Sequence, residues 1–281
     1  GIWYLESGIR NGSMKFSYVL PDPGSYPRWE DLDSDLDVMK RLGYDAVELQ
    51  ITDPGVLDEE RLRRSLERVG YPLCAVQTGG SYATSGNCLC TADPQIRCRT
   101  IGLLKSFVNL AARFGSMLVF GSLQGRVKDE PDLDAGRQRI LDAMTLVGRY
   151  ATERNVVIAY EPVNHLEVAY YHTIAEVHQV VKAIGLPGLR MMVDTFHMNI
   201  EEKAMQEPLA SIRDVLAHVH LSETNRDVLG VGHWDTGAFL RELHRLDYQG
   251  YCSVGVYNSR LSRHECIARC MDVLRCCALG T

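Results

Sequence analysis

The segment Arg190-Met191-Met192-Val193-Asp194-Thr195-Phe196-His197 joins a short apolar run to an acidic residue at the point where the run stops. A run of this length is typical of a buried strand in a parallel sheet. A carboxylate at the end of such a strand is costly unless it has a partner. The neighbouring runs on either side, Val156–Tyr160 and Ala217–Leu221, also end among polar residues: Glu161 follows the first, and the second contains His218 and His220. We therefore expect several strands to deliver polar groups to one place.

The same alternation of apolar run and longer amphipathic segment occurs eight times along the chain. The apolar runs are Phe16–Leu20, Ala46–Ile51, Leu73–Gln77, Met117–Phe120, Val156–Tyr160, Arg190–Val193, Ala217–Leu221 and Tyr251–Val256. The predicted helices are Trp29–Leu42, Asp58–Val69, Pro94–Phe114, Asp134–Arg154, Thr173–Ile184, Leu209–Leu216, Thr236–Leu246 and Ser262–Cys277. Alternating strands and helices imply parallel pairing. Eight such units predict a single (β/α)8 TIM barrel of the α/β class.

The main alternative to the barrel is an open, doubly wound sheet. Such a fold usually carries a glycine-rich phosphate turn after its first strand. The residues at that place, Leu20–Gly24, lack this pattern. We also see no linker or low-complexity tract, so we predict one catalytic domain over residues 14–281. Residues 1–13, which precede Met14, are interpreted as a leader or short extension.

Composition excludes several functional classes. The chain has 281 residues, of which 46% are hydrophobic and 23% charged, with a formal net charge of −6. No basic face is visible that could neutralise phosphates, so we expect no nucleic-acid partner. No apolar stretch is long enough for a membrane span. Nine cysteines are an odd number, which favours reduced thiols and a cytoplasmic protein. Cys88 and Cys90 lie in a loop, where no nearby residue in the sequence completes a zinc site.

Three adjacent strands present potential metal ligands at their C-terminal ends. These residues are Glu161 after the fifth run, Asp194 after the sixth and His220 in the seventh. Functional groups of a β/α barrel lie at this end of the strands. Two carboxylates and one imidazole suit Mn²⁺, Mg²⁺, Co²⁺ or Fe²⁺ better than a structural zinc. His218 faces the same side as His220 but lies deeper, and we interpret it as a hydrogen-bonded core residue.

Longer motifs around these residues resemble a known family. The sixth-strand stretch reads VDTFHMNIEE (193–202), the fifth EPVNHLE (161–167) and the seventh HVHLSETNR (218–226), followed by GVGH (230–233). Together with GYDAVEL (43–49), they resemble the xylose-isomerase-like barrel superfamily. Within it, they are most similar to the ketose (tagatose/psicose) 3-epimerases of the sugar-phosphate isomerase/epimerase branch. The resemblance covers nearly the whole chain from Met14.

The resemblance implies a role for each matching residue. Glu161 is implied to bind metal and to act as a general acid/base, and Asp194 and His220 to bind metal. Glu167, His197 and Arg226 are implied to contact the hydroxyl groups of a small-molecule sugar. The implied cofactor is a divalent metal, Mn²⁺ first, with Mg²⁺, Co²⁺, Fe²⁺ or Zn²⁺ as alternatives. Relatives are often dimers or tetramers, so a homo-oligomer is also expected.

These residue types fit one kind of chemistry. A cation that contacts the carbonyl and neighbouring hydroxyl oxygens of a ketose stabilises the enediolate formed when the adjacent carbon loses a proton. A carboxylate beside the cation can take that proton. Returning the proton to the other carbon gives isomerisation, and delivering a proton from the opposite face gives epimerisation. The sequence thus predicts a metal-dependent isomerase or epimerase of sugars or sugar phosphates.

One position departs from the family pattern. In the epimerases a glutamate on the eighth strand is the second acid/base and the fourth metal ligand, whereas GYCSVGVY (250–257) places Gly255 there. Tyr257 follows two residues later, and its phenol, with a pKa of about 10, is a poor substitute. Three interpretations remain: an impaired epimerase, a one-base isomerase or dehydratase, and a catalytically degenerate sugar-binding barrel. A DNA-repair endonuclease branch of the superfamily would need histidines on the third and fourth strands, which are absent.

Overall fold

The computed structural model describes residues 14–279, so the interpretation of residues 1–13 lies outside the described part of the chain. Eight parallel strands close into a barrel in chain order, each paired with the next and β8 paired with β1. The strands are β1 (Lys15–Leu20), β2 (Ala46–Gln50), β3 (Leu73–Gln77), β4 (Met117–Phe120), β5 (Ile158–Tyr160), β6 (Leu189–Asp194), β7 (Leu216–Leu221) and β8 (Tyr251–Val254). The predicted (β/α)8 barrel is confirmed.

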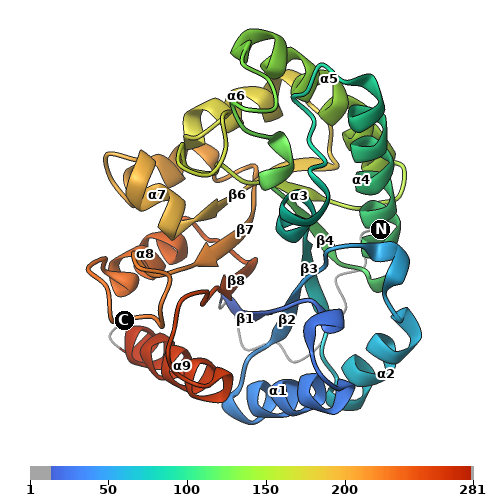
Figure 1. Cartoon of the computed structure of the whole chain (residues 1–281). Coiled ribbons are helices and arrows are strands. Elements are labelled where there is room, and N and C mark those ends of the chain that lie inside the picture. Colours follow the sequence, from blue (N-terminus) through green and yellow to red (C-terminus); the bar gives the residue numbers. More distant parts are fainter. Residues whose placement is uncertain (1–13, 280–281) are drawn as a thin grey trace.

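Helices surround the strands as an outer ring (Figure 1). They are α1 (Trp29–Leu42), α2 (Glu59–Val69), α3 (Gly79–Ser85), α4 (Pro94–Phe114), α5 (Leu133–Thr152), α6 (Ile174–Ile184), α7 (Thr195–Glu201), α8 (Thr236–Arg245) and α9 (Arg263–Leu279). Short 3₁₀ helices are η1 (Pro23–Ser25), η2 (Pro54–Val56), η3 (Ser122–Gln124) and η4 (Glu207–Ile212). Within residues 14–279, no helix is both long and apolar enough to cross a bilayer.

Local sequence signals explain where several helices begin and end. The side chains of Asp93 and Asp235 accept hydrogen bonds from the first turns of α4 and α8. Thr173 and Glu176 form a reciprocal capping box at α6. Gly115 and Gly185 end α4 and α6 in the left-handed conformation. These residue types therefore set the ends of α4, α6 and α8.

The helix predicted over Leu209–Leu216 is wrong. The structure has the 3₁₀ helix η4 there, and Leu216 is already the first residue of β7. Leu209 and Ile212 are both buried, and their spacing of three residues is satisfied by a tight 3₁₀ turn. Two short helices, α3 and α7, were not predicted, because seven residues carry too little periodicity to be recognised.

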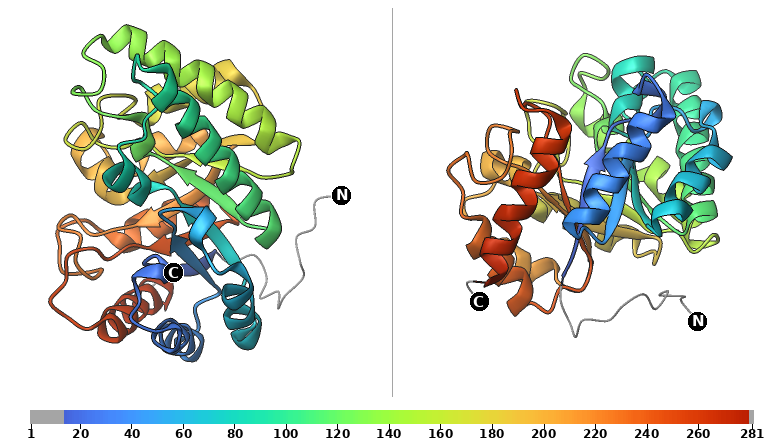
Figure 2. Two further views of the ribbon diagram at one scale, coloured as in Figure 1. Left: turned by 45° about the vertical axis from the view of Figure 1, so that its right-hand side comes forward. Right: turned by 90° about the horizontal axis from the view of Figure 1, so that it is seen from below.

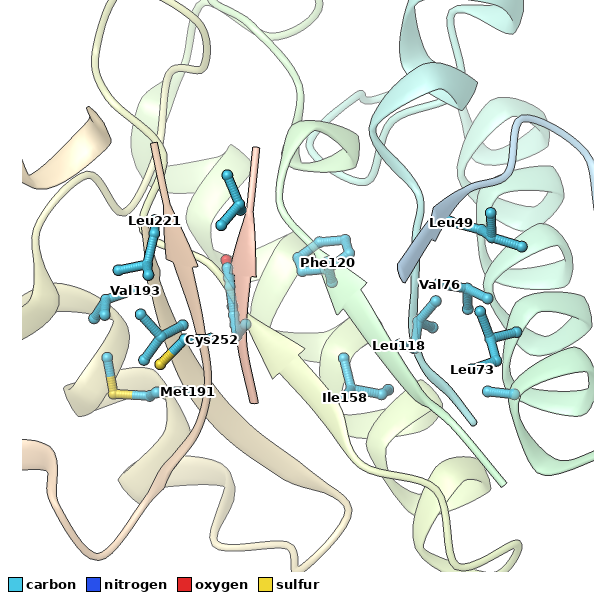
Figure 3. Packing of buried hydrophobic residues seen from close by; sticks show 14 of the residues in the cluster. Leu49, Leu73, Val76, Leu118, Phe120, Ile158, Met191, Val193, Leu221 and Cys252 are labelled. Atoms are coloured by element: carbon cyan, nitrogen blue, oxygen red, sulfur yellow. The ribbon is translucent and has the colours of Figure 1, made fainter. Parts of the chain in front are cut away.

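The main core lies between the strands and the outer helices. Strand residues such as Leu118, Phe120 and Ile158 pack in this layer (Figure 3), in the same cluster as helix residues such as Leu104. A smaller group inside the barrel consists mainly of short side chains, among them Ala46, Ala75 and Ala159. The interior also contains buried polar groups, which leads directly to the functional site.

The first and last helices close the ring. Figures 1 and 2 show α9 lying beside α1. Arg263 at the start of α9 donates to the carboxylate of Asp35 in α1 at 2.6 Å, and Tyr44 donates to the carbonyl of Ile267 at 2.9 Å. This closure holds β8 beside β1 and so fixes the eighth side of the barrel mouth.

Candidate active site

A cavity of about 300 Å³ opens at the C-terminal ends of the strands. Its volume is at the lower end of the range for small-molecule sites. The residues that line it are Gln50, Gln77, Thr78, Val119, Gly121, Ser122, Glu161, Glu167, Asp194, His197, His220, Arg226 and Tyr257. All six residues predicted from the sequence to bind metal or substrate are therefore around one cavity.

Two carboxylates form the centre of this site. Glu161 directly follows β5, and Asp194 is the last residue of β6. Asp194 is both a helix cap and a site residue: its Oδ1 accepts from the backbone N–H of Phe196 at 2.8 Å and caps α7. Its Oδ2 accepts from the guanidinium of Arg226 at 2.8 Å. Although burial favours the protonated form, Arg226 holds the pKa of Asp194 well below its usual range.

His220 faces these carboxylates with its Nδ1 atom. Its Nε2 lies 2.9 Å from Glu48 Oε1 and donates its proton there. Its Nδ1 lies 3.7 Å from Glu161 Oε1 and 3.8 Å from Asp194 Oδ2, and this nitrogen would offer its lone pair to a cation that displaces the proton. A histidine oriented in this way by a carboxylate is a typical metal ligand. One cation could contact all three side chains.

Glu48 is the partner that orients His220. It is completely buried inside the barrel, where it also accepts from Gln77 Nε2 at 2.8 Å and contacts His218 Nε2 at 2.7 Å. Burial opposes its charge, but His220 and His218 hold the pKa of Glu48 well below its usual range. Burial likewise opposes a positive charge on His220, yet Glu48 raises the pKa of His220 well above its ordinary value. The interpretation of His218 as a hydrogen-bonded core residue is confirmed.

His197 lies near the same two oxygens but with the opposite proton placement. Its Nε2 is 3.8 Å from Glu161 Oε1 and 4.0 Å from Asp194 Oδ2. Its Nδ1 lies 2.6 Å from Asn164 Nδ2. The Asn164 amide has a fixed orientation, since its oxygen accepts from the N–H of Leu166 and its nitrogen donates to Glu167. His197 Nδ1 is therefore an acceptor, and Nε2 carries a proton that points into the cavity.

His197 is close enough to the two carboxylates to be considered as a ligand, and His220 lies at similar distances. The hydrogen bonds argue against His197, because a protonated Nε2 has no lone pair for a metal. His197 Nε2 also lies 3.3 Å from Arg226 Nη2, which is a second donor. Two donors facing each other in a cavity form a natural site for a ligand oxygen that accepts from both. His197 and Arg226 thus direct two N–H donors at one place in the cavity.

Arg226 is held firmly in place. Its guanidinium lies over the ring of Phe196 at 3.8 Å and over the ring of Tyr257 at 4.9 Å. Its backbone adopts a positive φ of 62°, which turns the side chain back toward the barrel mouth. Glu167 Oε1 lies 3.9 Å from the same guanidinium. A planar cation fixed on two aromatic faces can direct its N–H groups at a sugar oxygen.

Gly121, just after β4, makes room for Glu161. A Cβ atom at this position would lie 2.7 Å from Glu161 Oε2 and 2.9 Å from Val163 Cγ2. Neither distance is compatible with van der Waals contact. The glycine therefore lets the Glu161 carboxylate lie against the wall of the cavity.

The sequence predicted a strand over Tyr251–Val256, which would contain Gly255. In the structure, regular pairing stops at Val254, so Gly255 lies one residue beyond β8. Its N–H still donates to Leu221 at 3.1 Å. A Cβ atom here would meet the Tyr257 ring at 2.8 Å and Ser222 Oγ at 2.9 Å. Burial raises the pKa of the Tyr257 phenol above its ordinary value, although 44% of the residue stays exposed. The Tyr257 ring occupies the space in front of Gly255.

The sequence analysis missed Glu48, Gln77 and Gly121. The signal for Glu48 was present: a carboxylate in the middle of the apolar run AVELQ (46–50) has to find a buried partner. Gln77 and Gly121 carry no comparable signal, since their roles depend on which strand lies opposite.

Comparisons with known proteins agree with this geometry. The sequence model of the xylose isomerase-like TIM barrel family matches residues 36–277. The chain is 29% identical to a ketose 3-epimerase of Arthrobacter globiformis, over 75% of this chain and 72% of that protein. It is 27% identical to an L-ribulose 3-epimerase of a Methylomonas species, over 82% and 81%. The crystal structure of a Methylomonas D-allulose 3-epimerase shares the fold, with a TM-score of 0.83 at 19% identity, covering 95% of this chain and 99% of that one.

Proposed function

Because this chain belongs to the xylose isomerase-like TIM barrel family, we propose that it is a divalent-metal-dependent isomerase or epimerase that acts on a ketose. The similarity to proteins named ketose and L-ribulose 3-epimerases supports the reaction class and the type of sugar. The single observation that carries the proposal is the difference in hydrogen-bond partners of two histidines that face the same two carboxylate oxygens: a carboxylate lies behind His220 and an amide nitrogen behind His197. One histidine is prepared to bind a metal and the other to bind substrate.

Glu161, Asp194 and His220 would hold the metal. Two carboxylate oxygens and an imidazole nitrogen fit Mn²⁺ well, which we propose as the cofactor. A divalent cation bound there supplies Lewis-acid polarisation of the substrate carbonyl. Glu48 orients His220 for this role and is itself a positioning residue.

The other residues of the cavity can carry out the proton transfer. Glu161 borders the cavity and can take the proton from the carbon next to the ketose carbonyl. As that proton leaves, the carbonyl oxygen gains negative charge. The N–H groups of His197 and Arg226, 3.3 Å apart, can both donate to this oxygen. Glu167 at the mouth can accept from a substrate hydroxyl.

Two outcomes follow from this first step, and Gly255 distinguishes them. If Glu161 returns the proton to the neighbouring carbon, the product is an isomerised sugar, and no second acid is needed. If another group delivers a proton from the opposite face, the product is an epimer. Gly255 offers no side chain for that, so the hydroxyl of Tyr257, which borders the same cavity, is our candidate donor. The missing carboxylate favours one-base isomerisation, and the similarity to named epimerases favours epimerisation.

The two histidines provide a direct test of the metal assignment. We expect His220→Ala to reduce Mn²⁺ affinity by at least about 100-fold in calorimetry, because it removes a ligand. His197→Ala should leave Mn²⁺ affinity within a few-fold of the unmodified chain and instead weaken ketose binding. Equal losses of Mn²⁺ affinity in both variants would contradict the assignment, as would a larger loss in His197→Ala.

A further inference from the structure

A second cluster of potential ligands lies outside the catalytic cavity, between the segments that follow β3 and β4. It consists of Cys88, Cys90 and Asp129, whose ligand atoms all lie within 4.8 Å of one another. The two segments are joined by backbone hydrogen bonds, from Leu89 to Leu123 at 2.9 Å and from Cys90 to Gln124 at 3.2 Å. The cluster is therefore a fixed junction of two βα loops.

The two sulfur atoms are already at a spacing that suits a thiophilic metal. Cys88 Sγ and Cys90 Sγ are 4.0 Å apart, and both residues are buried, at 1% and 0% exposure. In a tetrahedral zinc site with Zn–S bonds of about 2.3 Å, two sulfurs lie roughly 3.8 Å apart. Neither cysteine forms a disulfide. Little movement of the two sulfurs would be needed to share one ion.

Asp129 completes a set of three ligands. Its Oδ2 accepts from the hydroxyl of Tyr82 at 2.7 Å and from the backbone N–H of Arg126 at 2.8 Å. Hydrogen bonds of this kind orient the carboxylates that bind metals. The residue is half-buried, whereas both cysteines are buried.

Gly125 provides the space that the cluster occupies. Its φ is +104°, a conformation that favours glycine. A Cβ atom there would lie 2.4 Å from Cys90 Sγ and 3.4 Å from Asp129 Oδ2. The backbone at Gly125 thus lies directly against the Cys90 sulfur and the Asp129 carboxylate, and a side chain at this position would clash with the sulfur.

We propose that Cys88, Cys90 and Asp129 form a structural binding site for a thiophilic divalent cation, of which Zn²⁺ is the natural example. Two thiolates and a carboxylate carry three negative charges, so the site with a divalent ion has one excess negative charge. Arg126 and Lys128 lie over the ring of Tyr82, at 5.3 and 5.7 Å from its centre, and provide positive charge on the exposed side.

The bound ion would hold together one wall of the catalytic cavity. Thr78, just after β3, and Ser122, just after β4, line that cavity, and the cluster joins the segments to which they belong. The site uses none of the proposed catalytic residues. Its existence does not depend on the proposed reaction, and either can fail without the other.

Cadmium is a suitable probe, because ligation by thiolate sulfur produces an ultraviolet charge-transfer band that the oxygen and nitrogen ligands of the catalytic site do not give. We expect the full-length, reduced chain, saturated with Mn²⁺, to develop this band with one equivalent of Cd²⁺. The band should disappear in Cys88→Ser and in Cys90→Ser. Asp129→Asn should weaken Cd²⁺ affinity by about tenfold or more, and excess Zn²⁺ should abolish the band by competition.

The matched control is the double variant Cys276→Ser/Cys277→Ser, which removes two thiols on α9 and should keep the band. Mn²⁺ affinity measured on each variant shows whether it is folded. If Cys88→Ser or Cys90→Ser does not fold, the half-buried Asp129→Asn variant decides. No band in the unmodified chain, loss of the band only in the α9 double variant, or unchanged Cd²⁺ affinity in Asp129→Asn would overturn the proposal.

Discussion

Single side chains in this cavity are assigned by their hydrogen-bond partners and not by their distance to a common centre. His220 and His197 lie about equally far from the same carboxylate oxygens. They differ in what lies behind them: a carboxylate behind His220 and an amide nitrogen behind His197. A carboxylate accepts a hydrogen bond and an amide nitrogen donates one. His220 therefore turns Nδ1, a potential metal ligand, toward the cavity, whereas His197 turns an N–H toward it.

This assignment makes Glu48 important although it does not touch the cavity. We expect Glu48→Gln to lower Mn²⁺ affinity by about 10- to 100-fold in calorimetry, because it removes the charge that orients His220. Glu60→Gln on α2 is the matched control, since the Glu60 side chain is 84% exposed. Affinity that is equal in both variants would show that His220 does not need Glu48.

Much of the site could be predicted from the sequence at this scale, and the limit is physical. Glu161, Asp194 and His220 follow three consecutive apolar runs, and the barrel rule places strand ends together. The hydrogen-bond reason for His220 over His197 as ligand could not be derived from residue types, because it depends on Glu48 and Asn164, which come from other parts of the chain. The strand-end position of His220 and the family resemblance both favoured it, and the hydrogen bonds supply the physical reason.

At the scale of elements, the junction of β6 and α7 shows how one residue can belong to both structure and site. Asp194 caps α7 with one carboxylate oxygen and faces the cavity with the other. The end of β8 is different. Regular pairing stops at Val254, and the Tyr257 ring covers Gly255. Because residue 255 is a glycine, the end of β8 brings no carboxylate to the cavity.

A glutamate can be tested at that position, but the structure shows that the ring has to be removed as well. We expect Gly255→Glu combined with Tyr257→Ala to bind Mn²⁺ about tenfold more tightly than Tyr257→Ala alone, because a further carboxylate adds charge and a ligand. Ketose epimerisation should rise in the same comparison. If calorimetry and product analysis show no gain in either property, Gly255 does not stand in the place of a fourth ligand.

The strands and long helices of the barrel were predicted within about two residues, because long apolar and amphipathic periods are strong signals. The elements that were missed or wrong, α3, α7 and η4, are all short. Their form is set by what they pack against.

On the scale of the whole molecule, a metal bound at the proposed site would join the ends of β5, β6 and β7. A cation that binds the folded chain alone stabilises it by about 2.7 kcal/mol at 100 times its Kd. We therefore expect saturating Mn²⁺ to raise the melting temperature of the metal-stripped protein by roughly 5 °C in calorimetric scans. His220→Ala should show almost no rise. A rise of the same size in that variant would place the stabilising metal elsewhere.

The most direct test of the central claim is proton exchange at carbon. Candidate ketoses would be incubated with the Mn²⁺-loaded protein in D₂O and followed by NMR. We predict that deuterium enters the carbon next to the carbonyl with the unmodified chain and not with Glu161→Gln, which cannot take the proton. Sugar that binds with neither deuterium exchange nor conversion to another sugar would contradict the account and identify a barrel that binds sugars without catalysis, and exchange that persists in Glu161→Gln would contradict the role of Glu161.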